Sequence, residues 1–346
     1  MLPLILFRIF LALGGFSIDI LGSNEAQYLP VIFAVKGPEL SPEEVAFFEK
    51  YRPAGAILST WNIERDAQGN INWGKLQKLC SDIRLYSPYI LVDQEGGRVQ
   101  HLSGTNAYRA PAPRTFTEGI SGKNFGEKCE TLRQNVQAID SDLRRAGINV
   151  NCAPVCDLLF DGIPSFIGDR GFGTDPEVVE HFVEIWVKQA AQDGIISVLK
   201  HCPGHGSTAM DTHLNLPTVS KSLADLEQSD FKIFRTVIGA LRGGISGDDF
   251  WVMTAHIVYS AIDAEHCATQ SPAVIRMIRE EFGFRGKIIT DCICMKALRG
   301  EWWERAVASL GAGCDYILCC SADLKKKEEI AERVRGYLAA KGFGGK

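Results

Sequence analysis

Short apolar runs alternate with amphipathic segments along this chain from about Leu29 onward. Eight of the apolar runs have the length and the β-branched content of strands. They are continuous rather than alternating in polarity, which is typical of parallel strands that helices cover on the outer face. The predicted strands are Val31–Val35, Gly55–Leu58, Tyr89–Val92, Ile148–Cys152, Ile195–Leu199, Trp251–Ala255, Lys287–Thr290 and Asp315–Leu318.

Several of the amphipathic segments begin with residues that favour a helix start. Ser41 is followed by Pro42 and Glu44, the pattern of a serine cap with proline in the first turn and glutamate three residues after the cap. A serine–proline pair at residues 271–272 repeats this start before a second segment. A weaker, acidic start opens the amphipathic segment over residues 222–241.

Eight strand–helix repeats in 346 residues predict an α/β protein built as a single (β/α)8 TIM barrel. A doubly wound open sheet is the alternative, because repetition alone does not show that the sheet closes. No low-complexity linker divides the chain. We therefore expect one catalytic domain over residues 29–346, preceded by an apolar extension of uncertain role over residues 1–28.

The apolar start of the chain, residues 1–23, resembles a signal peptide or a short membrane anchor. Arg8 interrupts its apolar run, the start is not basic, and no clear cleavage site follows. The run is also shorter than the roughly 20 apolar residues that a spanning helix needs. We expect a cytoplasmic protein without stable membrane association, with export or anchoring through this segment as the alternative.

Composition limits the possible partners. Hydrophobic residues make up 46% of the chain and charged residues 23%, as in a soluble enzyme with a full core. The net charge is -5 and the longest basic run is Lys325–Lys327, so nucleic acid is not an expected partner. We expect this lysine run to lie on a solvated helix near the C-terminus, and the protein to be a monomer or weak homodimer.

The cysteines do not follow a disulfide or zinc-binding framework. There are eleven of them, an odd number, scattered along the chain. A CxC pair at Cys292 and Cys294 and a CC pair at Cys319 and Cys320 each lack a matching second half, so we expect no cysteine zinc site. A reducing compartment is the simplest interpretation.

Polar residues gather after successive predicted strands. In a TIM barrel the active site lies at the carboxyl ends of the strands, so these residues are expected to meet at one end of the barrel. They are Asp93 and Arg98 after the third strand, Asp169 and Arg170 in the connection after the fourth, Lys200 and His201 after the fifth, His256 after the sixth and Asp291 after the seventh.

The densest cluster of reactive side chains is KHCPGHGSTAMDTH at residues 200–213, directly after a predicted strand. Within it, Asp211 and His213 form an Asp-x-His unit, and a carboxylate beside an imidazole favours a group that donates and accepts a proton near neutrality. Gly204 and Gly206 would let this loop close over a substrate and reopen. The alternative is a polar surface loop in which Asp211 only caps a turn.

Asp291 stands between an apolar strand and further apolar residues, where an ionised carboxylate needs partners. It is a candidate carboxylate nucleophile, and the alternative is that it caps the following helix. Lys200 and Arg170, with Asp93, form a set that could hold the hydroxyls of a small polar ligand. Arg98 either joins them or forms an ion pair that supports the Asp93 loop.

A metal site at His201, His205 and His213 is a further possibility, but helix-breaking residues separate the first two histidines and no glutamate is placed as a general base. No nucleotide-binding glycine motif occurs either. We therefore expect no metal and no cofactor.

Taken together, these motifs resemble glycoside hydrolase family 3, and within it the single-domain bacterial β-N-acetylglucosaminidases. The resemblance covers roughly residues 29–320. The matching pieces, in the family's order, are Asp93–Gln100, Asp169–Gly173, Lys200–Gly206, Asp211–His213, Ala255–Tyr259, Thr290–Cys292 and Gly311–Asp315.

The resemblance implies a TIM barrel that hydrolyses its substrate in two steps with retention. Asp291 would be the nucleophile and His213 the acid/base, oriented by Asp211. The implied sugar-binding residues are Asp93, Arg98, Arg170, Lys200 and His201. The implied substrates are muropeptide fragments, N-acetylglucosamine linked β-1,4 to anhydro-N-acetylmuramic acid with or without peptide, handled in the cytoplasm during cell-wall recycling.

The chain departs from the family pattern at Cys202, Cys292 and Gly171, where an aromatic residue, a second aspartate and a serine are common. These changes put the fine substrate preference in doubt. A β-glucosidase-like or phosphorolytic relative is the near alternative, because water and phosphate could attack the same intermediate. A sugar-binding protein without catalysis is the remote one, and the pairing of Asp291 with the Asp-x-His unit argues against it.

Overall fold

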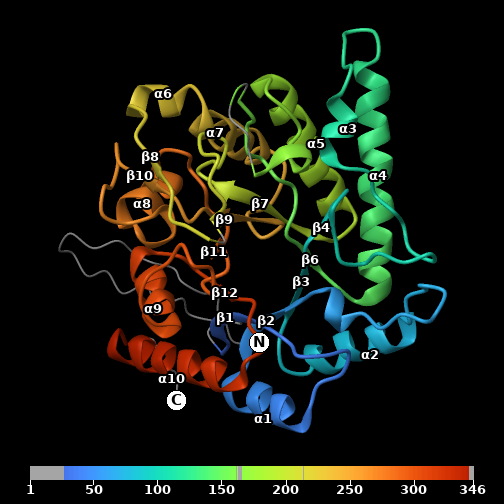
Figure 1. The fold of residues 1–346 in the computed structure, drawn as a ribbon, viewed down its shortest axis with the longest axis vertical. Helices are drawn as coiled ribbons and strands as arrows, with labels where there is room; N and C mark the ends of the chain where they lie inside the picture. Colours follow the sequence, from blue (N-terminus) through green and yellow to red (C-terminus); the bar gives the residue numbers. More distant parts are fainter. Residues whose placement is uncertain (1–26, 161, 163–165, 213, 343–346) are drawn as a thin grey trace, which may run out of the picture.

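Eight parallel strands form the centre of the molecule (Figure 1). The structure is a computed structural model, and it describes residues 27–342 except residues 161, 163–165 and 213. The strands of the central sheet are β1 (Leu29–Ala34), β2 (Pro53–Leu58), β3 (Tyr89–Val92), β6 (Val150–Asn151), β7 (Ile196–Cys202), β9 (Phe250–Thr254), β11 (Ile288–Thr290) and β12 (Ile317–Cys319).

The order of these strands shows that the sheet closes on itself. Hydrogen bonds connect them in the order β11-β9-β7-β6-β3-β2-β1-β12. A further parallel bridge between Ile289 and Tyr316 joins the two end strands. The predicted (β/α)8 barrel and its eight strands are therefore confirmed, and the doubly wound alternative is wrong.

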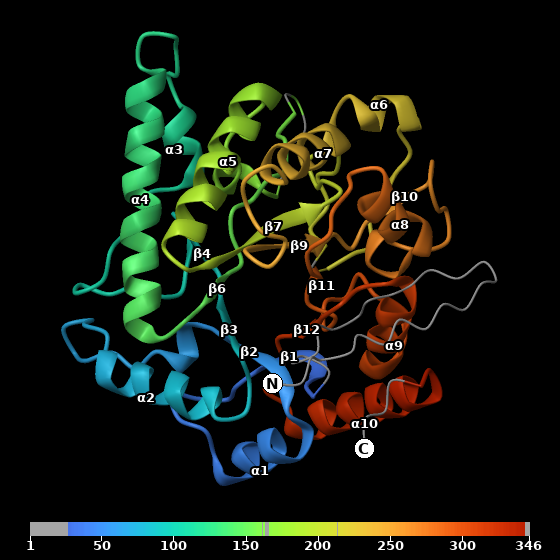
Figure 2. The same ribbon diagram turned by 180° about the vertical axis from the view of Figure 1, so that it is seen from behind.

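Helices surround this ring of strands, as Figures 1 and 2 show from opposite sides. They are α1 (Pro42–Tyr51), α2 (Trp73–Arg84), α3 (Pro113–Thr117), α4 (Phe125–Ala146), α5 (Pro176–Gln192), α6 (Leu223–Glu227), α7 (Asp230–Leu241), α8 (Pro272–Glu280), α9 (Trp302–Ala312) and α10 (Leu324–Ala340). Short 3-10 helices cover Thr60–Asn62, Gly168–Arg170 and Ala268–Gln270. Two small sheets lie beside the barrel, β4 (Gln94–Gly96) with β5 (Val99–Gln100) and β8 (Thr218–Val219) with β10 (Val258–Tyr259).

The helix starts expected from the sequence are confirmed at both serine–proline pairs. The Ser41 hydroxyl accepts the N–H of Glu44, and the Glu44 carboxylate accepts the N–H of Ser41 in return. Ser271 caps α8 through the N–H of Val274.

The segment expected as one amphipathic stretch over residues 222–241 instead forms two helices, α6 and α7. Ser222 caps α6 through the N–H of Asp225, but α6 ends at Glu227 and Ser229 has a non-helical backbone. The break has a physical reason, because Asp230 uses its carboxylate to accept the N–H of Ser207, 3.1 Å away. The helix break therefore places Asp230 where its carboxylate can hold the loop that follows β7.

The barrel interior is packed with apolar side chains from all eight strands or the residues beside them. Near the amino ends of the strands, the rings of Tyr89 and Trp251 lie 4.8 Å apart and those of Trp251 and Tyr316 lie 5.2 Å apart. These aromatic rings fill the amino end of the barrel, so the space for a ligand lies at the opposite, carboxyl end.

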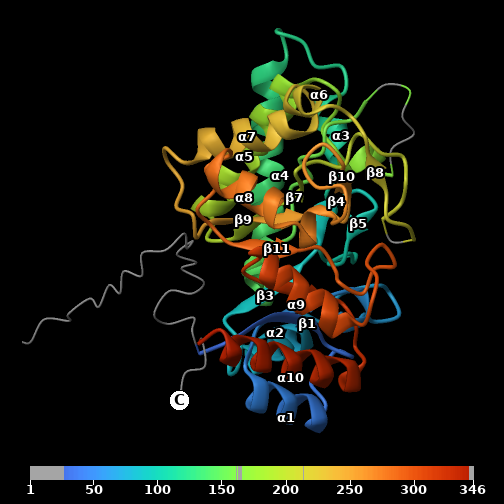
Figure 3. The same cartoon turned by 90° about the vertical axis from the view of Figure 1, so that its left-hand side faces the viewer.

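The last helix is attached to the first strand by a buried lysine. The Nζ of Lys327 donates to the carbonyl of Ala34 at 2.9 Å and lies 3.3 Å from a carboxylate oxygen of Glu44. Helices α1 and α10 lie side by side in all three overall views (Figures 1–3). The expectation that the whole lysine run is solvated is wrong for Lys327, because the carboxylate and the carbonyl replace its hydration.

Among the residues that the structure describes, no helix is long and apolar enough to cross a membrane. The proposed signal or anchor at residues 1–23 lies outside those residues.

Candidate active site

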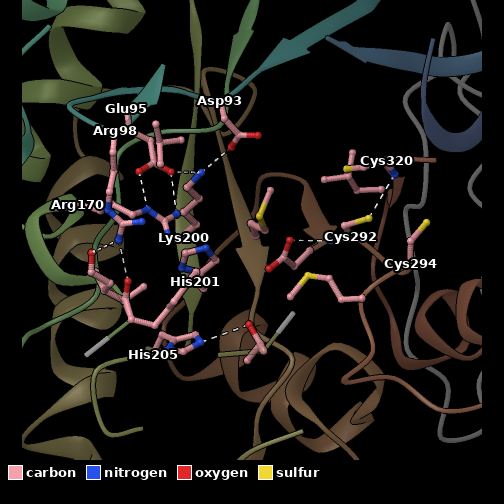
Figure 4. A pocket seen from close by; sticks show the side chains of 18 of the residues that line it. Asp93, Glu95, Arg98, Arg170, Lys200, His201, His205, Cys292, Cys294 and Cys320 are labelled. Atoms are coloured by element: carbon pink, nitrogen blue, oxygen red, sulfur yellow. Dashed lines mark hydrogen bonds and ion pairs between the residues drawn. The ribbon is translucent and has the colours of Figure 1, made fainter. Parts of the chain in front are cut away.

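A cavity of about 480 Å³ opens at the carboxyl ends of the strands. Its size is within the range of small-molecule sites. It collects side chains from the carboxyl ends of β7 and β9 and from the segments after β3, β6, β7, β11 and β12. Figure 4 shows them facing one another across the space. The lining residues that carry polar groups or sulfur are Asp93, Glu95, Arg98, Arg170, Lys200, His201, His205, Thr212, Met253, Asp291, Cys292, Cys294, Met295, Lys296 and Cys320.

A buried network of opposite charges forms one side of this cavity. We call Asp93, Glu95, Arg170 and Lys200 the charged cluster. The Nζ of Lys200 lies 2.6 Å from a carboxylate oxygen of Asp93 and 2.6 Å from one of Glu95. Arg170 donates from two nitrogens to the two oxygens of Glu95, at 2.8 Å each. Two-pronged contact of this kind fixes the guanidinium plane as well as its position.

Glu95 is the residue at the centre of the charged cluster, and sequence reasoning missed it. Its side chain is 1% exposed. Burial alone would raise the pKa of Glu95, but Lys200 and Arg170 outweigh burial and hold that pKa at about 2. The carboxylates of Asp93 and Glu95 raise the pKa of Lys200, although burial of the Lys200 side chain acts to lower it. Glu95 stands two positions after Asp93, so strand periodicity could have placed both side chains on one face.

Asn151 of β6 explains why Asp93 and Glu95 are so well positioned. Its amide oxygen accepts the N–H of Gln94 and its amide nitrogen donates to the carbonyl of Gln94, both at 3.1 Å. Both backbone groups between the two carboxylate residues are thereby fixed to the neighbouring strand.

Arg98 pairs with Asp169 rather than with the Asp93 loop. Its Nε lies 3.0 Å from the Asp169 carboxylate, and its Nη2 donates to the carbonyls of Phe166 and Ile167. Arg98 lines the cavity, but its measured contacts hold the connection that carries Arg170. Arg98 therefore forms a supporting ion pair, as one of the two interpretations of the sequence expected, but its partner is Asp169 and not the Asp93 loop.

Asp157 organises the loop after β7, and it too was missed. One of its oxygens accepts the N–H groups of His201 and His205, at 3.1 and 2.8 Å, and the other lies 2.7 Å from Nδ1 of His201. Burial would raise the pKa of Asp157, but the two imidazoles and these hydrogen bonds hold it below its ordinary value. The available sequence signal was that Asp157 directly follows the apolar residues Val155 and Cys156.

The two glycines of this loop are required by close packing. A side chain at Gly206 would meet the carbonyl of Leu158 at 1.7 Å, and one at Gly204 would meet Asp230 at 2.6 Å. Gly204 also has a φ of 137°, which side chains disfavour. The glycines therefore let the loop dock tightly, which differs from the hinge role that the sequence suggested.

The Asp-x-His unit begins where this docked loop ends. His205 is buried, and its Nε2 lies 3.5 Å from the hydroxyl of Thr212, which lines the cavity. Asp211 is half-buried, and its carbonyl accepts the N–H groups of Leu214 and Asn215. His213 lies outside the described residues, so its predicted role stays a prediction.

Asp291 follows β11 and lines the same cavity as the charged cluster. One carboxylate oxygen accepts the N–H of Cys292 at 2.6 Å. Nε2 of His256 donates to the carbonyl of Cys292 at 3.0 Å. The backbone of Cys292 is therefore held at both its N–H and its carbonyl. Burial would raise the pKa of Asp291, but His256, His201 and the N–H of Cys292 hold it below its ordinary value. Asp291 is therefore ionised at neutral pH.

The described part of the chain contains no group of three or more His, Cys, Asp or Glu side chains arranged to hold a metal ion. His201, one of the ligands considered, directs Nδ1 at Asp157. Because His213 is outside that part, the expected absence of a metal stays a prediction.

Comparison with known proteins identifies the family. Residues 26–340 match the family described as the glycosyl hydrolase family 3 N terminal domain. The chain belongs to glycoside hydrolase family 3. The resemblance noted in the sequence is confirmed, and the protein is a hydrolytic enzyme.

Relatives within family 3 narrow the activity. A β-hexosaminidase of Nitrosomonas eutropha is 34% identical over 316 residues, covering 90% of this chain and 86% of that protein. A β-hexosaminidase of Xanthomonas campestris is 32% identical over 323 residues, covering 91% and 92% of the two chains.

Solved structures within family 3 agree. NagZ from Neisseria gonorrhoeae in complex with N-trifluoroacetyl-D-glucosamine superposes with a TM-score of 0.76 at 29% identity, over 90% of each chain. This chain is a β-hexosaminidase-like glycosidase of family 3.

Proposed function

We propose that this family 3 enzyme is a retaining exo-β-N-acetylglucosaminidase in which Asp291 is the nucleophile. The observation that carries the proposal is that an ionised Asp291 shares one cavity with the charged cluster. A carboxylate is thereby available to attack, while oppositely charged side chains are available to hold sugar hydroxyls. Binding alone would not need this carboxylate.

In the first step the Asp291 carboxylate attacks the anomeric carbon and the bond from that carbon to the leaving oxygen breaks. His213, oriented by Asp211, gives its proton to the leaving oxygen. In the second step His213 takes a proton from water, the water oxygen bonds to the anomeric carbon, and Asp291 is released. Two inversions give overall retention, with histidine in place of the usual second carboxylate.

The charged cluster and His201 would hold the N-acetylglucosamine ring. Asp93 accepts hydrogen bonds from hydroxyls, while Lys200 and Arg170 donate them. Glu95 keeps both cations in place, and Asp157 fixes the orientation of His201. Arg98 acts by holding the segment that carries Arg170.

The proposed substrates are muropeptide fragments, N-acetylglucosamine linked β-1,4 to anhydro-N-acetylmuramic acid, with or without peptide. The proposed setting is cell-wall recycling in the cytoplasm, by a single catalytic domain over residues 29–346. The β-hexosaminidase names of the relatives and the aminosugar bound by the NagZ structure support the sugar, and the resemblance to single-domain enzymes supports the setting.

The test of the nucleophile is Asp291→Ala, assayed by release of p-nitrophenol from its N-acetyl-β-glucosaminide. We expect activity to fall by ~10⁴-fold or more, since removal of a nucleophile costs at least this much in well-studied hydrolases. A 5-fluoro N-acetylglucosaminyl fluoride should label the wild-type peptide that contains Asp291. Full activity of the variant, or label on another residue, would show that the assignment is wrong.

Parallel assays separate the alternatives. Wild-type protein is given the N-acetylglucosaminide and the glucoside, each with and without phosphate. We expect hydrolysis of the N-acetylglucosaminide without sugar 1-phosphate, and activity that a chelator does not change. Formation of sugar 1-phosphate would instead support the phosphorolytic alternative, and loss with the chelator would support a metal.

A further inference from the structure

The fold brings together the two cysteine pairs that had no partner in the sequence. Cys292 and Cys294 follow β11, while Cys319 ends β12 and Cys320 comes directly after it. The chain segments run side by side there, because the N–H of Ile293 donates to the carbonyl of Leu318 at 2.9 Å. The four cysteines, which we call the thiol cluster, therefore meet where the barrel closes.

The contacts within the thiol cluster are direct. Sγ of Cys294 lies 3.5 Å from Sγ of Cys319. The N–H of Cys320 donates to Sγ of Cys292 at 3.3 Å. Figure 4 shows Cys292, Cys294 and Cys320 on the side of the cavity opposite Glu95 and Arg170.

Access to the cluster comes through the substrate cavity. Cys294 is half-buried and lines the cavity, as Cys292 and Cys320 do, whereas Cys319 is fully buried. A small oxidant in the cavity would therefore reach Cys294 before Cys319, and the Sγ of Cys294 is already in contact with that of Cys319. This arrangement of an accessible thiol with a resolving thiol is what a redox-active pair requires.

We propose that Cys294 and Cys319 are a modification site, oxidised to a disulfide by a hydroperoxide that enters the substrate cavity. The Cys294 thiol loses its proton, its thiolate attacks one peroxide oxygen and the O–O bond breaks, giving a sulfenic acid. For hydrogen peroxide the leaving group is hydroxide, which takes up the proton that the thiol lost and becomes one water. The Cys319 thiol then attacks the sulfur of Cys294 and displaces its hydroxyl as a second water. The two sulfurs lose two electrons in total, and the peroxide gains them.

The two sulfur atoms are already in contact, as this bond requires. The two sulfurs must approach from 3.5 Å to a bond length of about 2.05 Å, and side-chain rotation supplies part of that movement.

The new bond would act on the nucleophile through two intervening residues. Cys292 donates its N–H to Asp291, and Arg305 holds the same loop from outside by donating to the carbonyls of Ile293 and Met295 at 2.7 and 3.0 Å. A pull on Cys294 toward β12 is therefore transmitted to the group that holds the Asp291 carboxylate. Oxidation should lower kcat.

The surroundings also set the rate of the reaction. Contact with Cys292 lowers the pKa of Cys294, but contact with Cys319 and burial raise it more, so the net pKa is above the ordinary thiol value. Since the thiolate is the reactive form, oxidation should be slow at neutral pH and faster at alkaline pH.

The test treats the whole protein with hydrogen peroxide at alkaline pH and follows both mass and activity. We expect a loss of two hydrogens, a cross-link between the tryptic peptides 288–296 and 306–325, and a kcat lower by about tenfold, since a displacement of ~1 Å at a catalytic group costs up to about 10²-fold. Dithiothreitol should reverse all three changes. N-acetylglucosamine in the cavity should slow them.

Variants identify the bonded pair. Cys294→Ser and Cys319→Ser should each abolish the cross-link and the reversible loss, while Cys320→Ser and Cys80→Ser should keep both. Cys80 is the matched control, because it is a buried cysteine on α2, away from the cavity. A loss of activity that dithiothreitol does not reverse, or a cross-link that survives Cys294→Ser, would overturn the proposal.

The activity readout rests on the proposed function, but the cross-link does not. If Asp291→Ala kept its activity while the cross-link still formed, the nucleophile assignment would fail and the modification site would stand. If Asp291→Ala lost activity while no cross-link formed in the wild type, the nucleophile assignment would stand and the modification site would fail.

Discussion

The two sides of the active-site cavity are built from opposite kinds of interaction. The charged cluster is fixed by ion pairs of 2.6 to 2.8 Å between side chains that are mostly buried. The thiol cluster is held by a 3.5 Å sulfur contact and by backbone groups. Full charges in a water-poor site fix position strongly, whereas thiols make weak hydrogen bonds. On the function proposed above, we expect the charged side to be rigid and to hold the sugar, and the thiol side to tolerate change.

Among the tests that separate the two sides, the largest effect should come from breaking the charged cluster at its centre. Glu95→Gln removes the negative charge that Lys200 and Arg170 share, and these two cations then lose their fixed positions. We expect kcat/KM to fall by about 10²-fold, as for other groups that preorganise a site. Steady-state assays on the aryl N-acetylglucosaminide measure this.

A matched control lies outside the cavity. Glu44→Gln breaks the buried pair with Lys327, and breaking a buried pair typically costs about 3–5 kcal/mol. We expect a similar loss of unfolding free energy in the two variants, but unchanged kcat/KM in Glu44→Gln. Equal activity in the two variants would contradict a specific role for the charged cluster.

Acid should weaken the same cluster in the wild type. The pKa of Glu95 is about 2 in the folded protein, below its ordinary value of 4.5. Because the pKa of Glu95 is lower in the folded than in the unfolded protein, ionised Glu95 stabilises the folded state at pH values above about 4.5. This contribution is lost as the pH falls from about 4.5 toward 2. The difference in unfolding free energy between wild type and Glu95→Gln should therefore shrink between pH 6 and pH 3 in urea titrations. A constant difference would show that Glu95 does not act through its charge.

The smallest effect should come from the thiol cluster under reducing conditions. Cys320→Ser changes a sulfur to an oxygen beside the cavity and removes no charge. We expect kcat/KM to change by less than about threefold, which is under ~0.7 kcal/mol. A loss as large as that of Glu95→Gln would mean that the thiol side is as rigid as the charged side.

The sequence predicted the barrel well because each strand is a continuous apolar run that the parallel sheet buries. Tyr89–Val92 was located to the residue, and Asp93 and Asp291 were placed at strand ends that do meet in one cavity. The break before Asp230 was not predicted, because nothing local shows that its carboxylate holds Ser207.

The residues missed are those whose roles depend on distant partners. Glu95 and Asp157 each had a weak local signal in the sequence, but their roles depend on Arg170 and His201 beside them. Lys327 looked solvated because its burial depends on Glu44, 283 positions away. The thiol cluster needs β11 and β12 to become neighbours, which requires the ring to close.

The pairing of β1 with β12 has a consequence for synthesis of the protein on the ribosome. The first strand emerges early, but its second neighbour is Ile317–Cys319, and the lysine that reaches its last carbonyl is Lys327. A nascent chain therefore exposes one open edge of β1 until Ile317–Cys319 has been translated. An open strand edge can pair with other chains. A premature stop codon or a long pause before α10 should therefore leave an aggregation-prone product without hydrolase activity.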